Sequence, residues 1–345
     1  MMSTIFSFAL GTGTRNSKGE WLEVFYPQPL MALSAEAQNA LGKVLAWQGG
    51  TAAMDVSNTQ MQSLAAAFHL AREEQLAIVA EKLAHSQQPL VATLLASDDK
   101  PASVPEVYLK LHLLSHRLVK PHQIKLDGMF GLLPNVAWTS EGAIDVRELA
   151  ERQLQARLQG RVLDVISVDK FPKMTNYVVP AGTRIADTAR VRLGAYLGEG
   201  TTIMHEGFVN FNAGTEGPGM IEGRISAGVF VGKGSDLGGG CSTMGTLSGG
   251  NNVIISIGEE CLIGANAGVG IPLGDRCTIE AGLYLTAGAV VQLIGSDGQP
   301  GNKIKARELA GKSDLLFRRN SVTGAIEALG NKSAIELNNE LHAHN

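Results

Sequence analysis

The sequence predicts a parallel β-helix, a solenoid in which the backbone winds through short strands stacked coil upon coil. Aliphatic residues recur at every sixth position in an early run, which is Ile185, Val191, Leu197, Ile203 and Val209. The same spacing returns in three later runs: Ile225, Val231 and Leu237; Ile257, Ile263 and Val269; and Ile279, Leu285 and Val291. An aliphatic side chain at every sixth residue can stack inside a coil of three hexapeptides, which is typical of hexapeptide solenoids.

Composition restricts the partners and the compartment. A formal net charge of −4 and a pI near 6.1 argue against a nucleic-acid partner, which would need a basic surface. No apolar run approaches the ~20 residues of a membrane-spanning helix, and the N-terminus lacks the basic residues of a secretory signal. The spacing of Cys241, Cys261 and Cys277 fits neither a disulfide framework nor a zinc site, so we expect buried thiols in a reducing cytoplasm.

Three domains are expected along the chain: an α-rich α/β domain at 1–172, the catalytic coil at 173–291 and a small C-terminal extension at 292–345. Strands are predicted at 5–10, 21–26 and 162–168, and residues 27–150 otherwise have helical patterns. The predicted helices are one capped by Ser57 with apolar residues as far as Leu83, one that starts at the capping-box pair Ser103 and Glu106 and ends near Pro121, one at 146–158, and a closing helix at 334–342.

The six-residue phase breaks at three places, which are 210–224, 238–252 and 271–274. Breaks in a solenoid usually project loops on one side, and binding sites are often found on such loops. We therefore expect irregular loops there, with Glu222 on the first of them.

The motifs within and around these breaks are much more specific than the hexapeptide itself. They include MHEGFVNFNAGTEGPGMIEGR (204–224), LGGGCSTMGTLSGG (237–250), LIGANAG (262–268), EAGLYLTAG (280–288), KARELAG (305–311) and LLFRRNS (315–321). Upstream, YLKLHLLSHRLVKPH (108–122) and LLPNVAW (132–138) extend the pattern. With these motifs the sequence resembles the longer form of the tetrahydrodipicolinate N-succinyltransferases.

This resemblance implies a left-handed β-helix, a cytoplasmic homotrimer, and active sites between adjacent coils. It also implies transfer of succinyl from succinyl-coenzyme A to the amine of L-2-amino-6-oxopimelate, the hydrated and ring-opened form of tetrahydrodipicolinate, in diaminopimelate and lysine biosynthesis. Small molecules would then be the only partners besides the other copies of the chain, with no nucleic acid and no membrane.

The resemblance also assigns roles to residues. Glu222 matches a carboxylate that forms an acyl-anhydride or acts as general base, and the residues leave both roles open. Gly245 matches a backbone N–H that faces the developing oxyanion. Arg224 suits the succinyl carboxylate, because a guanidinium can bind it in bidentate fashion. The positions matching the succinyl-coenzyme A site are Arg224, Gly239, Ser242, Ala265, Glu280, Ala281, Gly288, Lys305, Arg318, Arg319, Asn320 and Ser321.

Two features of the residues bear on the cofactor and on a metal. Residues 303–319 carry six Lys or Arg against Glu308 and Asp314, a basic segment in an acidic chain that suits a phosphate-bearing ligand. Glu206 matches a position that in some family members helps to hold Mg²⁺ on the threefold axis. The usual acidic companion is replaced by Ala189, so a ring of Glu206 side chains would bind a cation weakly.

Other functions are compatible with a solenoid. His205 is the only histidine in the coil, which excludes a γ-type carbonic anhydrase with its three histidine ligands but leaves a hexapeptide acetyltransferase with a histidine base. A sugar nucleotidyltransferase would need alternating strands and helices where residues 27–150 have helical patterns, although LGTGTRNSKG (10–19) imitates its loop. A trimeric scaffold without catalysis is the non-enzymatic alternative.

Overall fold

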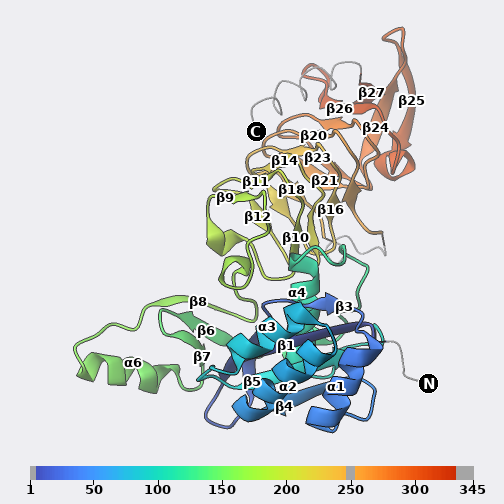
Figure 1. Ribbon diagram of the computed structural model, residues 1–345. Coiled ribbons are helices and arrows are strands. Elements are labelled where there is room, and N and C mark those ends of the chain that lie inside the picture. Colours follow the sequence, from blue (N-terminus) through green and yellow to red (C-terminus); the bar gives the residue numbers. More distant parts are fainter. Residues whose placement is uncertain (1–4, 246–252, 332–345) are drawn as a thin grey trace. The chain divides into compact units, whose positions relative to one another are not determined.

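The computed structural model in Figure 1 describes residues 5–245 and 253–331. The chain divides into two compact units, which are described here one at a time. Unit 1 comprises Met1–Val119, Gln123–Pro172 and Asn176–Val178, and unit 2 comprises Lys120–His122, Lys173–Thr175 and Val179–Asn345. No helix in the described ranges has both the length and the apolar character needed to span a bilayer.

Unit 1 is built on a five-stranded antiparallel sheet in the order β2-β1-β5-β4, with β3 paired to β1. A second antiparallel sheet has the order β7-β6-β8. The strands are β1 (Ser7–Arg15), β2 (Trp21–Phe25), β3 (Leu30–Met31), β4 (Ala52–Val56), β5 (Leu90–Leu95), β6 (Val136–Thr139), β7 (Gly142–Asp145) and β8 (Val165–Asp169). The helices are α1 (Ala35–Leu45), α2 (Asn58–Leu70), α3 (Glu74–Leu83), α4 (Val104–Ser115), α5 (Met129–Leu132) and α6 (Leu149–Leu158).

Helices α1, α2 and α3 share one apolar core with strands β1, β4 and β5. The prediction that Ser57 caps a helix is confirmed, because its hydroxyl accepts from the Gln60 N–H and Gln60 bonds back to the Ser57 N–H. The prediction of one helix as far as Leu83 is wrong. The helix ends at Leu70, because Arg72 adopts a left-handed φ of 60° that a continuous α-helix does not allow.

Other boundaries in unit 1 also differ from the prediction. The helix capped by Ser103 ends at Ser115 instead of near Pro121, because Arg117 turns to a positive φ of 62°. The helix predicted at 146–158 begins at Leu149. The helical interpretation of residues 27–150 is wrong, since it missed five strands. β5 is buried along its whole length, so its sequence, LVATLL, lacks the alternation that distinguishes a strand from a buried helix.

A buried histidine joins α4 to the sheet of unit 1. The Nε2 atom of His112 accepts from the Tyr26 N–H at 3.2 Å, and its Nδ1 atom donates to the Tyr108 carbonyl at 2.8 Å. The ring is fully buried among Phe25, Tyr26, Tyr177 and His116. Burial lowers the pKa of His112 from 6.5 to about 3, because a charged ring would lose its hydration and would present a second N–H to the Tyr26 N–H.

We expect the stability of unit 1 to fall as the pH drops from about 6.5 toward 3, because the unfolded chain binds the His112 proton in this window and the folded chain does not. His112→Gln should reduce the slope by one proton, or about 1.4 kcal/mol per pH unit. The three tryptophans, Trp21, Trp47 and Trp138, all lie in unit 1, so their fluorescence in denaturant titrations at several pH values reports this unit. The exposed His85→Gln is the control; equal slopes for His112→Gln and the wild type would contradict the expectation.

Unit 2 is a left-handed parallel β-helix, as predicted, and its coils wind through three sheets. The first sheet contains β9 (Arg184–Ile185), β11 (Thr201–Ile203), β14 (Gly219–Ile221), β17 (Asp236–Leu237), β20 (Leu262–Ile263) and β22 (Thr278–Ile279). The second contains β12 (Phe208–Val209), β15 (Arg224–Ile225), β18 (Ser242–Thr243), β21 (Gly268–Gly270) and β23 (Tyr284–Thr286), and the third contains β10 (Ala195–Leu197), β13 (Ala213–Thr215), β16 (Phe230–Val231) and β19 (Ser256–Ile257).

The aliphatic residues found by their period stack in register inside the coil. Ile203 lies between its neighbours Ile185 and Ile221, and the column continues through Leu237 and Ile263. The predicted loop at 210–224 is wrong: strands β13 and β14 occupy this stretch, and the buried Thr215 takes the inward position. The phase breaks there because the turn from Ile221 to Ile225 is two residues shorter than the usual hexapeptide, without any inserted loop.

The break at 271–274 is likewise a turn of four residues, because the buried Leu273 follows the buried Val269 after four positions instead of six. The Leu273 N–H donates to the Ser256 carbonyl of the preceding coil. The third break was predicted at 238–252. Residues 238–245 of this stretch continue the coil through β18, and residues 246–252 lie outside the described residues. The helix predicted at 334–342 also lies outside them.

The C-terminal part of unit 2 covers the last coil. Strand β26 (Leu315–Arg319) pairs with β22 and places Phe317 beside Ile279, and β27 (Ile326–Gly330) pairs with β26. The antiparallel strands β24 (Val290–Ile294) and β25 (Pro300–Lys305) form a hairpin whose turn is residues 295–299. Short 3₁₀ helices in unit 2 are Thr188–Arg190 and Ala306–Leu309, and a further one, Met174–Asn176, has its last residue in unit 1.

Candidate active site

One corner of the coil brings together several residues named from the sequence. This corner joins the first sheet to the second, and in successive coils it carries Glu206, Glu222, Gly239, Ala265 and Ala281. Backbone hydrogen bonds link neighbouring levels: the Gly240 N–H donates to Glu222, the Asn266 N–H to Gly239, and the Gly282 N–H to Ala265. We call this set the corner column.

The corner column above Glu222 is lined by small residues. The Glu222 Oε2 atom lies 3.4 Å from the point where a Cβ on Gly239 would stand. A Cβ on Gly238 would be 2.8 Å from the Ala265 nitrogen, and one on Gly264 would be 2.4 Å from the Ala281 nitrogen. The column therefore presents backbone and methyl groups next to a half-buried carboxylate, a surface that a long and flat ligand can approach closely.

Arg224 and Ser242 are neighbours on the second sheet. They are paired residues of β15 and β18, and Gly268 and Tyr284 continue the same row. The Arg224 side chain is exposed, while its N–H donates to the Cys241 carbonyl at 2.9 Å. A cation thus lies two residues beyond Glu222, held on a rigid strand.

The Cys241 thiol, from the coil that follows Glu222 and Arg224, lies against Gly223 between them and is fully buried. Burial raises its pKa to about 12; Arg224 opposes this shift and Glu222 adds to it. The thiol is therefore neutral near pH 7 and does not serve as a nucleophile.

The far end of the corner column meets the C-terminal strands. A carboxylate oxygen of Glu280 accepts from the Arg319 N–H at 2.7 Å. On the next strand, Glu327 binds Asn320 at 2.7 Å and Arg318 at 2.9 Å, and these contacts lower the pKa of Glu327. The Arg318 and Arg319 side chains remain exposed, as does Ser321, so this end presents basic groups to solvent.

The remaining named residues lie elsewhere in unit 2. Gly288 follows β23, and its carbonyl accepts from the Lys305 ammonium group at 3.1 Å. Gly245 ends the described part of its coil, next to residues 246–252. His205 and Glu206 are exposed on the corner of the first complete coil, and the Glu206 carbonyl accepts from Arg190 at 2.8 Å.

Two residues of this site were missed by the sequence reasoning, namely Gly223 and Cys241. The signal was present, because the four-residue spacing of Ile221 and Ile225 shows that the corner containing Gly223 is short. We interpreted that spacing as a loop, although in the structure it brings Gly223 onto the Cys241 thiol.

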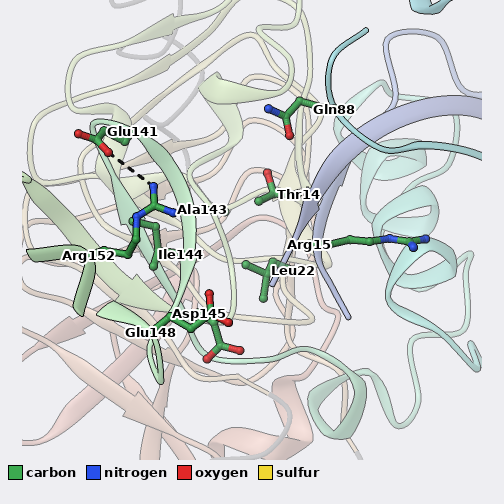
Figure 2. A pocket seen from close by; sticks show the side chains of 10 residues that line it. All are labelled: Thr14, Arg15, Leu22, Gln88, Glu141, Ala143, Ile144, Asp145, Glu148 and Arg152. Carbon is green, nitrogen blue, oxygen red and sulfur yellow. Dashed lines mark ion pairs between the residues drawn. The ribbon is translucent and has the colours of Figure 1, made fainter. Parts of the chain in front are cut away.

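Unit 1 contains a separate cavity of about 270 Å³, shown in Figure 2, and no residue named as a site candidate lines it. Its charged groups are bound to one another or to neighbouring side chains. Glu141 pairs with Arg152 at 3.6 Å, and Asp145 accepts from Asn16 and from Arg147. Its charges are thus already satisfied by the protein, and this cavity is not a second candidate for the active site.

The coil, the carboxylate at its corner and the basic C-terminal strands define a class of protein, the hexapeptide-repeat acyltransferases. Comparison with protein families agrees with this class and narrows it. Residues 254–287 match the hexapeptide repeat of succinyl-transferase, 133–173 match the tetrahydrodipicolinate N-succinyltransferase middle model, and 51–131 match the N-terminal model of the same family. The chain belongs to the tetrahydrodipicolinate N-succinyltransferase family.

Individual relatives extend this match over the whole chain. A 2,3,4,5-tetrahydropyridine-2,6-dicarboxylate N-succinyltransferase from Pseudomonas putida is 67% identical over 345 residues, covering 100% of both chains. The protein of the same name from Vibrio cholerae is 62% identical over 340 residues, covering 99% of each. A crystal structure from Campylobacter jejuni, described as a 2,3,4,5-tetrahydropyridine-2-carboxylate N-succinyltransferase, superposes with a TM-score of 0.88 at 32% identity, covering 97% of this chain and 94% of the other. The chain is accordingly an N-succinyltransferase, an enzyme of the acyltransferase class.

Proposed function

We propose that this enzyme transfers the succinyl group of succinyl-coenzyme A to the amine of L-2-amino-6-oxopimelate, the ring-opened form of tetrahydrodipicolinate, in cytoplasmic diaminopimelate and lysine biosynthesis. The observation that carries the proposal is the position of Glu222 on the corner column, between Arg224 and a row of small residues. The names of the relatives give 2,3,4,5-tetrahydropyridine-2,6-dicarboxylate as the acceptor and succinyl as the transferred group.

The chemistry requires a carboxylate, an oxyanion donor and a docking surface. Glu222 either acts as general base, accepting a proton from the amine as the amine nitrogen attacks the thioester carbonyl, or itself attacks the thioester carbonyl to form an anhydride that the amine then opens. In both routes the coenzyme A thiolate leaves. The Gly245 N–H stabilises the negative oxygen of the tetrahedral intermediate.

The cofactor would extend along the corner column toward the C-terminal strands. Gly239, Ala265 and Ala281 allow close approach of its chain, and Ser242 lies on the adjacent strand. The ligand contacts proposed beyond these are Glu280, Gly288, Lys305, Arg318, Arg319, Asn320 and Ser321, and the cations among them attract its phosphates. The proposed domains are 1–172, the catalytic coil 173–291, and the extension 292–345 with its coenzyme A contacts.

We propose a homotrimer whose active sites form between coils of neighbouring subunits. A cation on the threefold axis would be held by the Glu206 carboxylates of the three subunits, and Glu206 is exposed in unit 2. Because Ala189 stands where the usual acidic companion would be, this ring would bind a cation weakly. No step of the reaction is assigned to a metal.

The decisive test is release of free thiol by the purified protein with succinyl-coenzyme A and freshly made tetrahydrodipicolinate, with acetyl-coenzyme A in parallel. Amine-dependent release with the succinyl donor and little with acetyl is the expected result. Release with acetyl alone would overturn the proposal in favour of an acetyltransferase and would make His205 the base to examine. Release with neither donor would favour the scaffold alternative.

Arg224→Met tests the proposed recognition of the succinyl carboxylate. The variant keeps an unbranched side chain on β15 but loses the guanidinium, so the KM for succinyl-coenzyme A should rise about 10- to 100-fold, as expected for the loss of about 1.5–3 kcal/mol of charged hydrogen bonding. The KM for acetyl-coenzyme A should change little, because acetyl has no carboxylate. An equal rise for both donors would contradict this role, and Arg184→Met, at an exposed arginine on β9, is the matched control.

A further inference from the structure

The corner that carries Glu222 is shorter than the corners above and below it. Six residues separate Ile203 from Val209 and Leu237 from Thr243, whereas only four separate Ile221 from Ile225. The short turn is fixed through its backbone: Glu222 donates to the Leu237 carbonyl at 2.8 Å, and Arg224 donates to the Cys241 carbonyl at 2.9 Å. The chain therefore crosses this corner directly, with Gly223 at its centre.

Gly223 rests on the side chain of Cys241. A Cβ at position 223 would lie 2.2 Å from the Cys241 Sγ atom and 2.7 Å from the Cys241 carbonyl oxygen. The φ angle of Gly223 is not in the left-handed region, so glycine is needed here for space and not for its conformational freedom. The Cys241 thiol thus determines how closely the turn at Gly223 approaches the next coil.

The two residues that flank this contact are the two charged groups of the proposed site. Glu222 and Arg224 are the residues on either side of Gly223, and the Arg224 N–H donates to the Cys241 carbonyl, so both flank the contact with the Cys241 sulfur. Because Cys241 is fully buried, its side chain cannot move aside into solvent when the turn presses against it. A small change in the volume of residue 241 must consequently shift the turn.

We infer that Cys241 is a positioning residue for succinyl transfer, which acts by supporting Gly223 and so directing the Glu222 carboxylate and the Arg224 guanidinium. The inference rests on the proposed function of this site. A misplacement of about 1 Å at a reacting group can cost about 100-fold in rate, so a support under the reactive turn affects turnover more than it affects stability.

The test is a double-mutant cycle on Gly223→Ala and Cys241→Ala, with kcat and thermal unfolding measured for each variant. We expect Cys241→Ala to lower kcat about tenfold and Gly223→Ala about 100-fold, both through misplacement of the turn. The double variant should recover part of the activity lost by Gly223→Ala, because the new methyl group enters the space of the missing sulfur. Recovery would be partial, since the Cys241 carbonyl oxygen still lies 2.7 Å from the new Cβ.

Two further variants separate positioning from packing. Cys277→Ala removes an equally buried thiol of the coil away from Glu222 and should reduce stability similarly with kcat unchanged. Cys241→Ser nearly preserves the shape of the side chain and should keep at least half of kcat, so it answers the question even where Gly223→Ala fails to fold.

The inference is overturned if Cys241→Ala and Cys277→Ala have the same kcat, or if the losses in the double variant simply add. Both outcomes are distinguishable from failure of the proposed function. That failure would appear in the wild-type protein, as absence of amine-dependent thiol release with succinyl-coenzyme A.

Discussion

Glu222→Gln is expected to lower kcat for succinyl transfer by about 10²- to 10⁴-fold, the usual contribution of a positioned acid–base group. Glutamine keeps the size of the side chain and its place beside Gly239 but can neither accept the proton of the amine nor attack the thioester. Assembly and coenzyme A binding should be unchanged, because no other part of the corner column is altered. Steady-state thiol release, sedimentation and calorimetric coenzyme A binding measure the three properties.

The control is Glu259→Gln, an exposed glutamate on a different corner of the β-helix, which should leave all three properties unchanged. A Glu222→Gln enzyme with nearly the wild-type rate would remove Glu222 from the mechanism. The wild type can also distinguish the two proposed roles when amine is omitted. Rapid release of one thiol per site would support an anhydride, whereas no release would support a general base.

Gly198→Ala is expected to destabilise unit 2 by more than about 3 kcal/mol, which is beyond the usual range for overpacking. A Cβ at Gly198 would lie 1.8 Å from the Glu216 carbonyl oxygen of the next coil, and the backbone of both residues is fixed by coil-to-coil hydrogen bonds, from the Gly198 N–H to Thr215 and from the Glu216 N–H to Val231. The two coils would have to separate at this corner. Urea titration followed by β-sheet circular dichroism measures the loss.

Gly330→Ala provides the comparison for this variant. Nothing lies within 4 Å of a Cβ at Gly330, and its φ is not positive, so the change should cost less than about 1 kcal/mol. Comparable stability of the two variants would show that the coil can expand at its corners, contrary to the tight packing described here.

The coil could be predicted because every level repeats the same local requirement for an inward aliphatic residue and a small corner residue. Unit 1 has no such repetition. Its strands β4 and β5 pair with partners far along the chain, so their structure depends on contacts that a local pattern does not contain. The break between α2 and α3 was missed for a related reason, since the apolar face continues across Arg72 even though the backbone does not.

The candidate site was harder to predict from the sequence than the fold. Glu222 and the small residues could be named only through resemblance to a family, because a glutamate among many glycines carries no chemistry by itself. These residues share one corner because the coils stack in parallel register. A period of six implies such a register, but it does not show which residues lie on the same corner. The contact between Gly223 and Cys241 is recognised only from the distance between the position of a Cβ on Gly223 and the Cys241 sulfur atom. No sequence pattern supplies that distance.

The pairing of β26 with the last strand of the first sheet also bears on solubility. A parallel coil that ended at β22 would present an open row of N–H and C=O groups, a surface on which the first coil of another molecule could continue the stack. Because β22 is followed in the sheet by β26, the antiparallel β27, β24 and the antiparallel β25, the row ends in a strand that carries Pro300, Lys303 and Lys305. The segment proposed to hold the cofactor thus also protects the solenoid from growing into a fibre.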